Sequence, residues 1–161
     1  MNWSLILNIL LMYGILVLVN VPAPFLGLEF GSDSDTTRRL WYQPPGFVIP
    51  IVWFVLFTLL GIGRYILLQN GAEGYDLLII ALAVLCATYA YYTLGLAQLT
   101  GVSALWYGLF GNLLVIVCAL FVAFKLFPLS QTTAFLVLPV AVWTLFATAI
   151  VLGEMRFEKL I

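Results

Sequence analysis

The sequence predicts an all-α integral membrane protein, a five-transmembrane-helix bundle with one long loop between its first and second helices. Of the 161 residues, 65% are hydrophobic and only 8% are charged, whereas an average soluble domain has about 25% charged residues. The apolar residues fall into five runs, each close to the ~20 residues that a helix needs to cross a bilayer. We therefore expect the lipid bilayer to surround a single transmembrane domain spanning residues 1–161.

The first predicted span covers residues 3–21 and ends at Pro22 and Pro24, because proline cannot continue a helix. No basic region or clear small-residue cleavage site is present, so we interpret this segment as a retained span rather than a signal peptide. An uncleaved signal anchor would give the same structure. The only long connection, the predicted loop 22–46, follows and contains charges of both signs.

The second predicted span covers residues 47–69 and begins after two adjacent prolines. Pro45 can open a helix, since the first N–H groups of a helix are unpaired, but Pro44 and Pro45 cannot both lie inside one. Trp41 and Tyr42 precede them, and amphipathic rings favour the depth of the membrane surface. We therefore expect this segment to be held at that surface.

The remaining spans are predicted at residues 77–97, 103–127 and 132–153. Pro128 ends the fourth span, and Ser130 is a candidate cap for the fifth. Small residues four positions apart indicate close backbone approach between membrane helices, either within the bundle or between subunits. Such pairs are Ala83 with Ala87, Ala119 with Ala123, and Ala149 with Gly153.

Charged and catalytic side chains are nearly absent from the predicted spans. Arg64 and Lys125 lie near span ends, where long side chains can extend to the interface. The predicted cores contain no Asp or Glu, which argues against a proton-coupled pump or an ion channel. A net charge of −1 gives no basic face for nucleic acid.

The residues that usually hold metals or catalyse reactions are also missing. Histidine is absent, so no imidazole can bind zinc or haem iron or act as a base near neutral pH. Cys86 and Cys118 lie in apolar runs, which is typical of small buried residues. We therefore predict no metal site, no obligatory cofactor and no defined catalytic residue.

Aromatic residues make up 16% of the chain and offer a candidate ligand site. Tyr89 and Tyr92 lie in the third predicted span, where they either pack and anchor the helix or line a cavity for a flat hydrophobic small molecule. Trp53 and Trp143 could point into such a cavity. Asn112 is the polar side chain most costly to leave unpaired in a span, which makes it a candidate ligand contact.

Two motifs carry a resemblance to a known family. The first is YQPPGF at 42–47, followed by Trp53 and by Leu56-Phe57; the second is PVAVW at 139–143, followed by Ala147-Thr148. They resemble the W-x-P-P-x-W…W…L-Y and P-Y-x-x-W…A-T signatures of the TspO/MBR family. This family comprises tryptophan-rich sensory proteins and translocator proteins, the peripheral-type benzodiazepine receptors. The resemblance covers nearly the whole chain.

The chain departs from the family pattern at several positions. The family's Asn and Trp of the third span are replaced near Cys86 and Tyr89, and Val140 replaces the Tyr that follows Pro139. A cholesterol-type motif is missing from the end of the fifth span. The chain therefore resembles a diverged member of the family.

The resemblance implies a five-helix bundle, often dimeric, with a porphyrin-binding pocket at one end beneath the first loop. We expect the protein to bind a tetrapyrrole or similar flat ligand as a sensor, chaperone or scavenger. The expected ligand-binding residues are Trp53, Trp143, Tyr89, Tyr92, Asn112 and Phe57, and the expected lid residues are Trp41, Tyr42, Pro44 and Pro45. The one enzymatic activity that the resemblance implies is light-dependent porphyrin degradation, at tryptophans that match Trp53 and Trp143.

An alternative is a structural or assembly subunit of a larger membrane complex, such as a pigment–protein complex, that kept the fold and lost the pocket. Its partner would then be that complex, whereas the first hypothesis favours a homodimer. A bacterial inner membrane, a photosynthetic membrane or an organelle membrane would suit either function.

Overall fold

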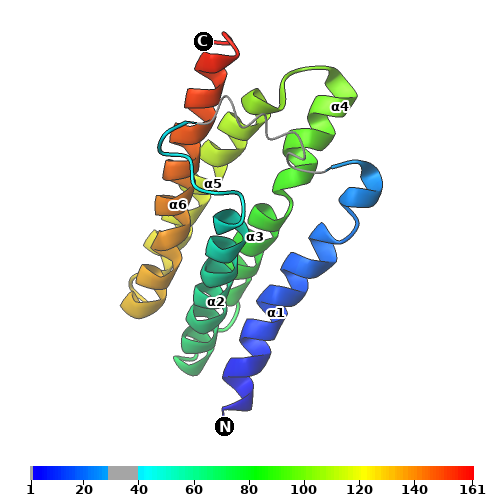
Figure 1. Cartoon of the computed structure of the whole chain (residues 1–161). Coiled ribbons are helices and arrows are strands. Elements are labelled where there is room, and N and C mark those ends of the chain that lie inside the picture. Colours follow the sequence, from blue (N-terminus) through cyan, green and yellow to red (C-terminus); the bar gives the residue numbers. More distant parts are fainter. Residues whose placement is uncertain (1, 29–39) are drawn as a thin grey trace.

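The computed structural model describes residues 2–28 and 40–161, and the regular elements within them are helical (Figure 1). Part of the predicted loop 22–46 therefore lies outside the described residues. Among the residues described, four helices are long and apolar enough to cross a membrane. They are α1 (Trp3–Asn20), α2 (Val48–Gln69), α5 (Ala104–Leu126) and α6 (Gln131–Phe157).

The long helices begin and end at residues that suit helix termini. The side chain of Asn2 accepts a hydrogen bond from the Leu5 N–H at the start of α1. Ser130 accepts one from the Thr133 N–H at 3.2 Å and caps α6. Polar caps of this kind satisfy N–H groups that have no partner inside the helix. After α1, Pro24 begins a short 3₁₀ helix, η1 (Pro24–Leu26).

The segment predicted as a third span at residues 77–97 is not one straight helix. It comprises α3 (Asp76–Ala87), the π-helical η3 (Tyr91–Gly95) and α4 (Leu96–Thr100), and the two halves are bent by 52°. Thr88 Oγ1 donates to the carbonyl oxygen of Val84 at 2.9 Å at this break. Such side-chain bonds compete with the helical ladder and bend helices.

The small residues let the helices approach one another within this chain. Ala83, Ala87, Ala119 and Ala123 are all buried in the main hydrophobic core. Large apolar side chains such as Leu18, Phe110 and Phe124 are exposed on the outside of the bundle. Since the alanine pairs are covered by the chain's own helices, they do not mark a surface for a second subunit.

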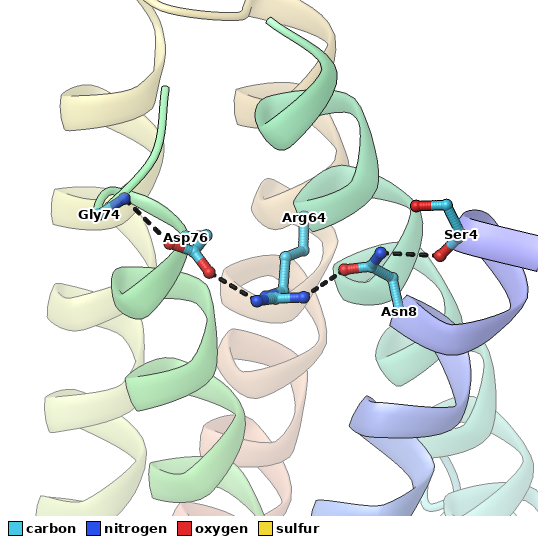
Figure 2. Close-up of polar contacts among 5 residues, drawn as sticks. All are labelled: Ser4, Asn8, Arg64, Gly74 and Asp76. Atoms are coloured by element: carbon cyan, nitrogen blue, oxygen red, sulfur yellow. Dashed lines mark hydrogen bonds and ion pairs between the residues drawn. The ribbon is translucent and has the colours of Figure 1, made fainter. Parts of the chain in front are cut away.

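The expectation that Arg64 extends to the interface is wrong. Arg64 turns inward, and its Nη2 lies 2.7 Å from Asp76 Oδ2 (Figure 2). Its Nη1 donates to Asn8 Oδ1, while the Asn8 amide donates to the carbonyl oxygen of Ser4 at 2.8 Å. The Gly74 N–H donates to the other oxygen of Asp76 at 3.1 Å. This polar cluster joins α1, α2 and the start of α3.

Candidate functional site

The segment before α2 lies along the C-terminal half of α6 (Figure 1). Tyr42 Oη donates to the carbonyl oxygen of Ala149 at 3.1 Å. Gln43 Nε2 donates to Glu154 Oε1 at 3.0 Å. Two polar contacts thus hold the predicted lid against α6. The pairing of Gln43 with Glu154 was not predicted from the sequence.

A glycine of α6 makes room for this segment. A Cβ atom at Gly153 would lie 2.5 Å from Tyr42 Oη and 2.6 Å from Leu40 Cδ1, well inside van der Waals contact. Ala149 and Gly153 therefore pack against the segment at residues 40–43 rather than against a second helix.

The other predicted lid residues lie at the edge of the bundle. The Val48 N–H donates to the carbonyl oxygen of Pro45 at 2.8 Å, so the chain turns into α2 directly after the two prolines. Trp41 is 93% exposed, and its ring meets that of Tyr42 edge-on at 5.4 Å. Pro44 is half-buried and Pro45 is exposed.

Tyr89 and Tyr92 form an aromatic pair at the bend after α3. Their ring centroids are 5.4 Å apart in an edge-to-face arrangement. A Cβ atom at Gly108 of α5 would lie 3.1 Å from Tyr89 Oη, and one at Gly111 would overlap the Tyr92 ring. Two glycines three residues apart therefore open the surface of α5 to the two rings.

Two polar groups, one of them on this pair, are buried without a hydrogen-bond partner among the described residues. They are Tyr92 Oη and Asn112 Nδ2, and Asn112 is only 2% exposed. Asn112 directly follows Gly111, the glycine against which Tyr92 packs. A buried group left unpaired costs about 1–3 kcal/mol. An amide donor and a hydroxyl in one region can bind an acceptor such as a carboxylate or a carbonyl oxygen.

The predicted tryptophans lie on α2 and α6. Trp53 contacts Phe57 edge-on, with 6.2 Å between ring centroids, and Phe57 is completely buried. Trp143 lines a groove of about 410 Å³ together with Val52 and Leu56 of α2. That groove does not include Trp53, Phe57 or the two tyrosines.

The structure thus places the predicted residues in three groups: Trp53 with Phe57, Tyr89 with Tyr92, and Trp143 on the α2–α6 groove. Asn112 follows Gly111, the glycine that contacts Tyr92. Gln43, Glu154, Gly108 and Gly111 were not predicted. Glu154 is the first charge after the fifth apolar run, which could have drawn attention to it. Among the residues described, no group of three His, Cys, Asp or Glu side chains is placed to hold a metal ion.

Comparison with known proteins gives one positive result. The model of the TspO/MBR family matches residues 5–155, from the first turn of α1 to the last turns of α6. A search of curated proteins found no significant match. Together with the apolar helices, the family match identifies an integral membrane protein. The match covers nearly the whole chain, and the chain therefore belongs to the TspO/MBR family.

Proposed function

We propose that this protein binds a tetrapyrrole or a similar flat hydrophobic ligand at the end of the bundle next to the segment at residues 40–45. The unpaired Asn112 Nδ2 and Tyr92 Oη carry the proposal. Tyr92 belongs to the aromatic pair with Tyr89, and Asn112 follows the glycine that contacts the Tyr92 ring. Binding sites for such ligands combine apolar rings with a few well-placed polar groups. Binding without turnover suits a sensor, a chaperone or a scavenger.

The proposal includes five membrane spans, with the bent segment crossing as one of them. The segment from Asp76 to Thr100 contains 25 residues, which as a helix extend roughly 37 Å. The hydrocarbon core of a bilayer is about 30 Å thick, so the segment is long enough even when bent. Its bend would then place Tyr89 and Tyr92 inside the membrane.

Each group of residues has a role in the proposed complex. The rings of Tyr89 and Tyr92 part from their edge-to-face contact and stack on the ligand. Asn112 and Tyr92 bind a carboxylate or carbonyl group at the ligand's edge. The contact of Gln43 with Glu154 closes the segment over the site. Trp53 and Trp143 complete the aromatic wall, and any light-driven breakdown of a bound porphyrin would use them.

Replacing Asn112 with leucine is expected to weaken binding of protoporphyrin IX by about 10- to 150-fold, because a hydrogen bond to a charged acceptor contributes about 1.5–3 kcal/mol. Leucine has a similar shape and leaves no unpaired donor, so the fold should be retained. Absorbance titration of the protein in mild detergent measures the affinity. Asn70→Leu, at the exposed C-terminal end of α2, is the matched control and should bind as the wild type does.

The double variant Trp53→Phe/Trp143→Phe tests the tryptophan assignment in the same titration. We expect this variant to bind protoporphyrin IX more weakly than the wild type, because phenylalanine offers less area for stacking. Unchanged affinity in this variant would remove the tryptophans from the site. Unchanged affinity in Asn112→Leu as well would reject the proposed site.

A second candidate function is that of a structural or assembly subunit of a larger membrane complex. It is favoured by the close packing of Tyr89 and Tyr92 against Gly108 and Gly111, which leaves their rings in contact with the chain's own helices. Purification in gentle detergent distinguishes the two functions. Co-migration with a large complex and no uptake of protoporphyrin IX by the isolated protein would favour the assembly function.

A further inference from the structure

A second groove is lined by residues of α5, α6 and the turn between these two helices. That turn lies at the end of the bundle opposite the C-terminus (Figure 1). Its volume is about 680 Å³. The lining is mostly apolar and includes Tyr75, Leu120, Phe124, Lys125, Pro128 and Phe135. It shares Phe135 and Leu138 with the groove at Trp143, but none of the residues proposed above for the tetrapyrrole site lines it.

The depth of the groove corresponds to part of one leaflet of a bilayer. Its lining extends from Pro128 and Leu129 in the turn to Leu138 of α6. Leu138 lies seven residues beyond the start of α6 at Gln131, which is about 10 Å along a helix axis. One leaflet of the hydrocarbon core is about 15 Å thick. An acyl chain that enters from the membrane surface would therefore lie along this groove.

The charge at the mouth of the groove is positive. Lys125 is exposed in the last turn of α5, with its ammonium 5.6 Å from the centroid of the Phe121 ring. The ion pair found in the described residues joins Arg64 to Asp76 and does not involve Lys125. Glu73, which is exposed, does not line the groove. A cation at this depth is positioned to meet a lipid phosphate.

We propose that this groove binds an anionic phospholipid, with one acyl chain between α5 and α6 and its phosphate paired with Lys125. The apolar lining accounts for the chain, and the positive charge at the mouth selects an anionic headgroup over a zwitterionic one. A basic residue beside a cleft between membrane helices is a known form of lipid recognition.

Native mass spectrometry of delipidated protein in mild detergent tests this proposal, with phosphatidylglycerol and phosphatidylcholine as probes. The wild type is expected to bind one phosphatidylglycerol about fivefold more tightly than phosphatidylcholine. Attraction between one lysine near the membrane surface and an anionic headgroup strengthens binding by about this factor. Lys125→Gln should lower the affinity for phosphatidylglycerol to that for phosphatidylcholine, and Lys125→Arg should retain the preference. Arg156→Gln removes an exposed charge near the other end of α6 and should change nothing.

Phosphatidylglycerol with a photoreactive acyl chain provides a second measurement on the wild-type protein. The label is expected at Tyr75 or within residues 120–138, all of which belong to the groove, and inorganic phosphate should not compete with the lipid. Equal binding of the two lipids, an unchanged preference in Lys125→Gln, a label at neither Tyr75 nor residues 120–138, or competition by phosphate would each overturn the proposal.

Discussion

Replacing Asp76 with leucine is expected to lower the free energy of unfolding by about 3–5 kcal/mol, because it leaves a buried charge without its partner. The side chains of Arg64 and Asp76 are only 18% and 11% exposed. With Asp76 gone, the guanidinium keeps its hydrogen bond to Asn8, but no carboxylate balances its charge. Equilibrium unfolding in mixed micelles, followed by circular dichroism, measures the loss.

The double variant Arg64→Met/Asp76→Leu is the control for this prediction. Replacing both partners of a buried pair with apolar residues is often neutral or stabilising, so the double variant should regain most of the lost stability. The single variant Arg64→Met completes the comparison. If the stability losses of Asp76→Leu and Arg64→Met add up to that of the double variant, the two charges do not interact, and the polar cluster does not hold the three helices together.

The fold class was predictable because length and hydropathy decide it. Uninterrupted apolar runs, ended by Pro22 or Pro128, suffice to predict α1 and α5. The break in the third segment was not predictable from composition. Thr88 could equally have bonded within a straight helix. Tyr91, just after the break, donates to the carbonyl oxygen of Val19, which lies 72 positions earlier in the chain.

The candidate site was predictable only in part, since its residues meet across helices. The types of residue, Trp, Tyr and Asn, were evident from the sequence. The contact of Tyr42 with Ala149 joins residues 107 positions apart, and no spacing rule within one helix predicts it. Arg64 was misjudged for a similar reason. Its partner lies on the next helix, beyond the turn, and only the folded bundle brings the two together.

Replacing Gly61 with alanine is expected to destabilise the protein by about 1–3 kcal/mol, the usual effect of adding atoms to a tightly packed core. The new Cβ would lie 2.8 Å from the Cα atom of Ile9 and 3.1 Å from its amide nitrogen. Because the obstructing atoms belong to the backbone, no change of side-chain rotamer relieves the overlap, and α1 as a whole must move away from α2.

Gly14→Ala is the matched control, since a Cβ atom at Gly14 of α1 meets nothing within 4 Å. Alanine favours the helix over glycine by up to about 1 kcal/mol, so this variant should be neutral or slightly more stable in the same unfolding measurement. Equal stability of the Gly61→Ala and Gly14→Ala variants would contradict the close approach of α1 and α2.

The effect of Gly61→Ala should extend beyond the glycine itself. Thr58, Gly61 and Arg64 are spaced by three on α2 and therefore share one face, which meets α1. Thr58 Oγ1 lies 2.5 Å from Tyr13 Oη, and Arg64 donates to Asn8. A displaced α1 would lengthen both contacts. Gly61→Ala combined with Asp76→Leu should therefore cost less than the sum of the two single variants, because the first change already loosens the cluster that the second one breaks.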